Sequence, residues 1–137
     1  MISMTCAKAE PLRFVIVGDM PYNESQTLLF EDKIVPAISG GGFAFAIHVG
    51  DFKGGGSDCT NAGLARAYAV ISQLIPDRVF YTPGDNDWTD CDRNKLSNPI
   101  SKLARLDRLR KVFFGQPLRL PGEWAYHRQE GFPENAM

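Results

Sequence analysis

The sequence is poor in histidine, nearly neutral overall and free of long apolar runs. Only two histidines, His48 and His127, occur in the 137 residues, and the three cysteines include no Cys-x-x-Cys pair. A zinc site built on thiolates is therefore not expected. The formal net charge of −1 gives no reason to expect nucleic acid or acidic lipid as a partner. No segment approaches the roughly 18 apolar residues that a membrane-spanning helix needs, so no membrane span is expected.

The length and the 44% hydrophobic content fit one domain with a modest core. We assign residues 11–137 to that domain. Residues 1–10 are expected to be unstructured or the remnant of a signal peptide. Their Ala7-Lys8-Ala9 segment has the small-x-small form of a signal-peptidase site, but no apolar segment precedes it.

Three short apolar segments each run into a Gly-Asp pair. Residues 14–17 precede Asp19, residues 43–49 precede Asp51, and residues 78–81 precede Thr82-Pro83-Gly84-Asp85. Apolar runs of this length predict buried strands, and parallel strands bring their carboxyl ends to one edge of a sheet, where ligands bind. The three aspartates are therefore expected to converge. Clustered carboxylates repel one another unless a cation compensates, which indicates a metal site, with a solvated polar turn as the alternative.

Apolar residues at helical spacing occur between the strands, over residues 24–39 and 61–75, and after the last strand, over residues 99–114. This order predicts a right-handed βαβαβ unit of the α/β class. Pro36 is expected to kink or shorten the first helix. The expected core positions on the three helices are Leu28, Ile34, Val35, Ile38, Leu64, Tyr68, Ile71, Leu74, Ile75, Ile100, Leu103, Leu106, Leu109 and Phe113.

The last helix also carries a basic face, and a loop-like tail follows it. We interpret this face as a solvated surface rather than a site for membranes or anionic ligands. Its members are Lys102, Arg105, Arg108, Arg110 and Lys111. Residues 115–137 are expected to form loops, with one short strand around residues 124–126.

Two longer motifs carry a resemblance to a known family. They read His48-Val49-Gly50-Asp51-Phe52-Lys53 and Thr82-Pro83-Gly84-Asp85-Asn86-Asp87-Trp88-Thr89-Asp90-Cys91. Together with Gly18-Asp19, they resemble a bacterial branch of the calcineurin-like metallophosphoesterase superfamily. The similarity covers roughly residues 12–135 and the amino-terminal part of the family's domain. It implies one βαβαβ part of an α/β/β/α sandwich and the activity of a metal-dependent phosphoester hydrolase.

The resemblance also implies roles for the polar residues. Asp19 would bind a first metal ion, Asp51 would bridge two ions, and Asp85 would bind the second. Asn86 stands where the family has its catalytic histidine, and Asp87 would orient its neighbours. Asn86 can donate a hydrogen bond to a phosphoryl oxygen but has no proton to give a leaving group, so esters of acidic alcohols or phenols are the expected substrates.

The implied cofactor is a pair of divalent ions, Mn, Fe, Mg or Zn. The family's usual Asp-x-His is replaced here by Asp19-Met20-Pro21, and its later histidine ligands are absent. Carboxylate oxygens suit hard ions, so Mn is favoured. His48 lies just inside a strand end and is interpreted as a packed side chain rather than a ligand.

Lys53 and Tyr22 are further candidate contacts to a phosphoester substrate. Lys53 follows Asp51 by two residues, and Tyr22 lies in the loop after Asp19. A solvated lysine and a packed tyrosine are the alternatives. The loop Gly54-Gly55-Gly56 could cradle phosphate in a nucleotide-binding module, but it lacks the Gly-Lys-Ser/Thr ending of a P-loop.

Cys59 and Cys91 lie in the loops after neighbouring strands, so a disulfide between them is expected. In the chain-entropy model, closing a loop of about 33 residues stabilises the fold by roughly 3–4 kcal/mol. Together with the segment at residues 7–9, such a bond favours a periplasmic or secreted location. Reduced thiols would instead fit a cytoplasmic location.

The family's sandwich packs two sheets face to face, and this chain supplies strands for about one of them. One apolar sheet face is therefore expected to stay exposed unless a homodimer or a missing carboxy-terminal segment covers it. Two functions follow from the sequence. The first is a phosphoester hydrolase that is incomplete in this chain, and the alternative is a non-catalytic remnant that binds metal or phosphate or serves as an interaction domain.

Overall fold

The computed structural model describes residues 11–115, 120–122 and 124. Its centre is a parallel sheet in the order β1-β2-β3, formed by β1 (Val15–Val17), β2 (Ala46–His48) and β3 (Val79–Tyr81). Val17 pairs with His48, and His48 pairs with Tyr81, so the three strands end level with one another. The expected α/β class with a parallel sheet is confirmed. A second sheet facing this one stays a prediction.

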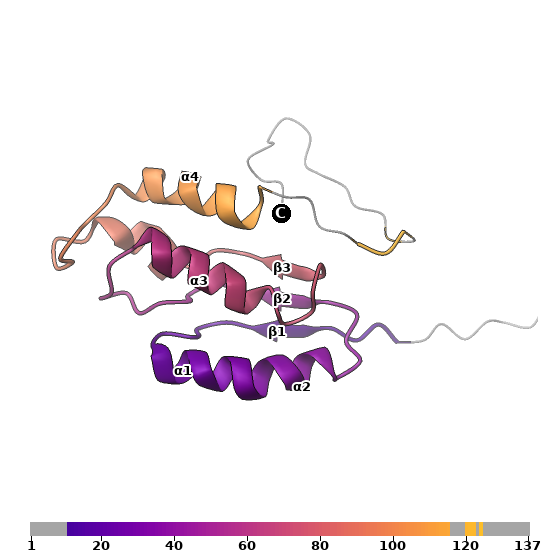
Figure 1. Ribbon diagram of the computed structural model, residues 1–137. Coiled ribbons are helices and arrows are strands. Elements are labelled where there is room, and N and C mark those ends of the chain that lie inside the picture. The colour runs from indigo at the N-terminus through magenta and orange to yellow at the C-terminus, as the bar shows by residue number, and fades with distance from the viewer. Residues whose placement is uncertain (1–10, 116–119, 123, 125–137) are drawn as a thin grey trace, which may run out of the picture.

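Helices connect the strands and cover one face of the sheet (Figure 1). The first connection contains α1 (Glu24–Leu29), the π-helical η1 (Phe30–Ile34) and α2 (Val35–Ser39). The second contains α3 (Asn61–Ile71), and β3 is followed by the short 3-10 helices η2 (Asp85–Asp87) and η3 (Thr89–Asp92) and then by α4 (Lys102–Phe113). The segment 1–10, His127 and two residues of the strand expected at 124–126 lie outside the described residues.

Pro36 was expected to kink or shorten the first helix, and it does not shorten it; a π-helical turn instead precedes it. The chain stays helical from Glu24 to Ser39 because the π-helical turn lets the Val35 N–H donate to the Phe30 carbonyl. Pro36 then lies in the first turn of α2, where its missing N–H costs little. At the other end, the Asn23 side chain caps α1 by accepting a hydrogen bond from the Gln26 N–H.

The core lies between the helices and the sheet face that carries Val15, Val17, Ala46, His48 and Tyr81. Its fully buried apolar centre consists of Phe30, Ala46, Leu64, Val70, Leu74 and Leu109. The prediction that Leu28 lies in the core is wrong, because this side chain is 51% exposed.

Helix α4 turns a different face to the core than the sequence pattern suggested. Arg105 and Leu109 are buried, and Val112 and Phe113 pack against the core, at a helical spacing of i, i+4, i+7 and i+8. The expected core residue Leu103 is 68% exposed. The interpretation of the basic face as wholly solvated is also wrong, since Arg105 is only 1% exposed and bonds to backbone carbonyls.

The opposite face of the sheet is apolar and partly open. Phe45 lies at its centre, with ring centroids 5.0 Å from Phe14, 5.4 Å from Phe80 and 5.7 Å from Trp124. Beside them, Ile16 is 57% exposed. An exposed apolar sheet face was expected from the sequence, and the described residues form such a face. Among the helices described, none is both long and apolar enough to cross a membrane.

The expected disulfide between Cys59 and Cys91 is present, and both half-cystines are buried. It joins the loop before α3 to η3. The bond thus fixes the loops that follow β2 and β3 relative to each other.

Removing this disulfide should destabilise the fold without abolishing it. We expect the double variant Cys59→Ala/Cys91→Ala to lose about 3–4 kcal/mol of unfolding free energy, because the unfolded chain regains the entropy of an open loop. Urea denaturation with and without reductant measures this loss. Reductant should destabilise the wild type and leave the double variant unchanged; equal effects on both would contradict the prediction.

Candidate functional site

The three Gly-Asp turns meet at the carboxyl end of the sheet, as the sequence predicted. The Asp19 N–H donates to the Gly50 carbonyl over 3.2 Å, which joins the turns after β1 and β2. The Asn86 N–H donates to Asp51 Oδ1 over 3.0 Å, which joins the turns after β2 and β3. Asp19, Asp51 and Asp85 therefore lie along one edge, which we call the carboxylate edge.

Backbone geometry explains the glycines at this edge. Gly50 has φ +84°, and a Cβ there would collide with the backbone of Pro83 and Gly84. A Cβ on Gly84 would collide with Asp51. Asp19 and Asp51 themselves adopt left-handed conformations, with φ 57° and 56°. The close approach of the turns thus needs glycine at two positions and holds two aspartates in a conformation that non-glycine residues seldom adopt.

Asp87 is the structural centre of the site. Its carboxylate is fully buried, and Oδ2 accepts hydrogen bonds from the Asp51 N–H (2.8 Å), the Gly84 N–H (2.9 Å) and the Tyr81 hydroxyl (2.7 Å). Its other oxygen, Oδ1, accepts from the Phe52 N–H over 3.1 Å. All four donors thus converge on this one side chain. Asp87 is positioned to orient its neighbours, the role that the family resemblance implied.

The carboxylates of the edge act on one another electrostatically. Partial burial raises the pKa of Asp51, and the nearby charges of Asp87, Asp85 and Asp19 raise it further, whereas the hydrogen bond from the Asn86 N–H opposes the shift. The charged neighbours that act most strongly on Asp51 are all carboxylates. A positive charge placed among them would relieve this repulsion.

Tyr22 and Asn86 adjoin the carboxylates. The Tyr22 hydroxyl donates to Asp19 Oδ1 over 3.0 Å. Burial and the adjacent Asp19 raise the pKa of Tyr22 to about 12, so the hydroxyl keeps its proton at neutral pH. The Asn86 side chain lies near the same hydroxyl. Both residues offer hydrogen-bond donors beside the carboxylate edge.

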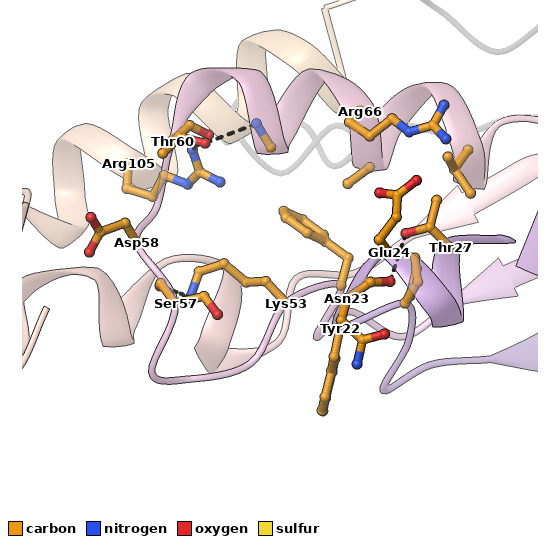
Figure 2. A pocket seen from close by; sticks show the side chains of 15 residues that line it. Tyr22, Asn23, Glu24, Thr27, Lys53, Ser57, Asp58, Thr60, Arg66 and Arg105 are labelled. Carbon is orange, nitrogen blue, oxygen red and sulfur yellow. Dashed lines mark hydrogen bonds between the residues drawn. The ribbon is translucent and has the colours of Figure 1, made fainter. Parts of the chain in front are cut away.

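Lys53 does not join this group, although it follows Asp51 by only two residues. Its Nζ donates to the carbonyls of Gly54 (3.1 Å) and Ser57 (2.9 Å), so the side chain is folded under its own glycine-rich loop. Lys53 is only 9% exposed and lines a cavity on the helix side of the sheet together with Tyr22 and Arg105 (Figure 2). Arg105 was not predicted to line a cavity, because it was grouped with the other cations of α4 as part of a solvated face.

His48 is a packed strand residue, in keeping with its interpretation from the sequence. It is fully buried, its Nε2 lies 2.9 Å from the Met20 carbonyl, and its Nδ1 accepts from the Gly50 N–H. These partners assign a neutral imidazole with its proton on Nε2. Burial lowers the pKa of His48, which agrees with this assignment.

The carboxylate oxygens of this edge are the candidate ligands for a metal ion. Within residues 11–115, 120–122 and 124, no group of three or more His, Cys, Asp or Glu side chains is placed to hold a metal ion. Hard ions such as Mg²⁺ are commonly held by one or two carboxylates together with water and substrate phosphate. The mutual repulsion around Asp51 and the oxygen chemistry of the edge suit an ion bound in this way.

Comparisons with known proteins add no assignment. No family model, curated protein or solved structure matches this chain. The assignment of function therefore depends on the motifs and on the geometry of the site.

We predict that Asp87→Asn destabilises the fold by about 2–3 kcal/mol. An amide presents one oxygen and one NH₂ group, so at least one of the four donors would face another donor. Urea denaturation measures the loss. Asp85→Asn is the matched control, because Asp85 is exposed and an amide oxygen can still accept the Asn86 N–H. Equal stability of the two variants would contradict the central role of Asp87.

The buried neutral His48 should make stability depend on pH. Its folded-state pKa lies below the ordinary value of 6.5, so the unfolded chain takes up a proton first as the pH falls. His48 therefore contributes its full share to the free energy of unfolding above pH 6.5. Below pH 6.5 this contribution falls by up to about 1.4 kcal/mol per pH unit. His48→Gln does not titrate, and the stability advantage of the wild type over this variant should shrink between pH 7.5 and 5.5. A difference that stays constant with pH would refute the assignment.

Proposed function

We propose that this chain belongs to a metal-dependent phosphoester hydrolase of the calcineurin-like type that acts at the carboxylate edge. The observation that carries the proposal is the joining of three Gly-Asp turns by the Asp19–Gly50 and Asn86–Asp51 hydrogen bonds. These bonds gather oxygen ligands at the carboxyl end of a parallel sheet, where α/β proteins bind their ligands. The expected substrates are phosphoesters with acidic leaving groups.

The chain's own residues would bind and orient the substrate. A divalent cation, with Mn²⁺ favoured, would be held by carboxylates among Asp19, Asp51 and Asp85 and would supply positive charge against the phosphoryl oxygens. Asn86 would donate a hydrogen bond to the same oxygens, and the protonated Tyr22 would do so once its hydroxyl no longer donates to Asp19. Asp87 would keep Asp51 and Gly84 in place through its backbone contacts.

A second candidate is a non-catalytic domain that binds metal or phosphate. It is favoured by the lack, within the described residues, of a ligand set with three or more members.

The open sheet face is a further part of the proposal. A second copy of the chain packed on Phe14, Ile16 and Phe45 would cover it, and sedimentation of the purified chain at several concentrations reports such a dimer.

The first test is a titration of Mn²⁺ into chelator-stripped protein, followed by an assay with p-nitrophenyl phosphate, whose leaving group needs no proton. Mn²⁺ at ten times its Kd should add about 1.4 kcal/mol to stability and support turnover. Asp51→Asn should lose the stabilisation and lower turnover by at least about 100-fold. Asp32→Asn, an exposed position on the helix side, is the control and should retain both.

The outcomes separate the two candidates. Binding of Mn²⁺ that depends on Asp51 but supports no turnover would favour the non-catalytic domain. Failure of millimolar Mn²⁺ to bind would reject the hydrolase and the metal-binding form of the second candidate. Turnover that survives in Asp51→Asn would place the chemistry elsewhere.

A further inference from the structure

A cavity of about 260 Å³ lies among the helices, next to the loops that follow β1 and β2 (Figure 2). Residues of the β1–α1 loop, α1, the β2–α3 loop and α3, together with Arg105 of α4, form its walls. The lining residues include Tyr22, which also adjoins the carboxylate edge, but not Asp19, Asp51 or Asp85. The carboxylates of the edge therefore do not line the cavity. Its size suits a ligand smaller than a typical drug-sized molecule.

Arg105 reaches from α4 into this wall with one hydrogen-bonding group unused. Its Nε donates to the Asp87 carbonyl over 3.0 Å, and its Nη1 donates toward the carbonyls of Cys59 and Thr60 over 3.4 and 3.2 Å. The buried Nη2 has no hydrogen-bond partner among the described residues. A buried guanidinium with an unused N–H group is costly, and such a group calls for an acceptor that is absent from the protein itself.

Lys53 adds a second positive charge at the same end of the cavity (Figure 2). Two of its three N–H donors bond to the Gly54 and Ser57 carbonyls, which are neutral acceptors. The amino terminus of the 11-residue helix α3 adjoins Arg105, since Arg105 contacts the Thr60 carbonyl. The positive end of the helix dipole therefore adds to the charges of the two side chains.

The negative charge of Asp87, which does not line the cavity, acts on both Arg105 and Lys53, and Asp58 and Lys53 also act on each other. Among the described residues, neither cation forms an ion pair with a carboxylate. Arg66 is paired with Glu31 at 2.8 Å. Asp58 points away from the cavity and accepts hydrogen bonds from Ser97 and Asn98. Glu24 lies at the opposite end, beneath Arg66. The cavity thus has a cationic end and an acidic end, and Phe52, Ala67 and Val70 provide apolar wall.

We propose that this cavity binds a small molecule through one anionic oxygen group, with Arg105 Nη2 and Lys53 Nζ as its donors. The apolar part of the ligand packs on Phe52, Ala67 and Val70. A carboxylate and a phosphate monoester share the required chemistry. Glu24 disfavours a second anionic group at the far end of the same ligand. The site does not depend on the proposed hydrolase activity.

The test uses benzoate, phenyl phosphate and the neutral benzamide as probes, titrated by NMR into the full chain with excess chelator present. One of the two anions should bind with a Kd of about 1 mM or tighter, and benzamide should bind at least about tenfold more weakly. The stronger of the two anions identifies the oxygen group that the site prefers. Benzamide binding as tightly as both anions, or no binding of either anion at 20-fold higher concentration, roughly 20 mM, would overturn the proposal.

Variants locate the site. Arg105→Met should weaken anion binding about ten- to hundredfold, whereas Arg108→Met, an exposed position on the same helix, should leave it unchanged. Asp51→Asn should also bind the anion as the wild type does, which separates this site from the carboxylate edge. If Arg105→Met does not fold, Ser57→Glu decides, because Ser57 is an exposed lining residue and a negative charge there should repel the anion. Wild-type affinity in folded Arg105→Met or in Ser57→Glu would overturn the assignment.

Discussion

The buried carboxylate of Asp87 is the interaction on which the rest of the site depends. It draws the backbone N–H groups of Asp51, Phe52 and Gly84 and the Tyr81 hydroxyl to one point. These donors come from the turn after β2, the turn after β3 and the end of β3 itself. Without this acceptor, three backbone N–H groups at the carboxyl end of the sheet would lack their partner, because the strands have already ended there.

Asp87 also connects the two charged regions of the molecule. Its side chain fixes the backbone of Asp51, which projects at the carboxylate edge, and its own carbonyl accepts from Arg105 Nε in the wall of the cavity. Between them, Phe52 is buried in the core and Lys53 turns under its loop. These three consecutive residues thus place a carboxylate at the sheet edge, an aromatic ring in the core and an ammonium group on the helix side. The disulfide between Cys59 and Cys91 holds the loops on either side of this arrangement.

The strands, the helices and the meeting of the Gly-Asp turns were predictable from the sequence, because each depends on a local pattern. Apolar runs before Gly-Asp fix the strand ends, and parallel topology brings those ends together. The core face of α4 was not predictable in the same way. Leu103 and Leu109 both fit a helical stripe, and only tertiary packing decides that Leu109 is buried while Leu103 is exposed.

Arg105 shows why the cavity escaped the sequence pattern. It occupies the first position of the observed i, i+4, i+7, i+8 stripe that continues with Leu109, Val112 and Phe113, whereas the apolar spacing predicted a core stripe through Leu103 and Leu106. The charge of Arg105 also suggested a solvated residue, since guanidinium groups are seldom fully buried.

Arg105 donates its hydrogen bonds to backbone carbonyls. These acceptors allow the guanidinium to be buried, but it has no ion-pair contact with a carboxylate among the described residues. Asp87 offers it a backbone oxygen, and the Asp87 carboxylate already accepts four other hydrogen bonds. A buried charge is stable only when acceptors surround it, and neutral carbonyls satisfy a guanidinium less completely than an anion does. Asp87 therefore stabilises the carboxylate edge through its side chain. The guanidinium of Arg105, in the wall of the adjacent cavity, is left able to bind an external anion.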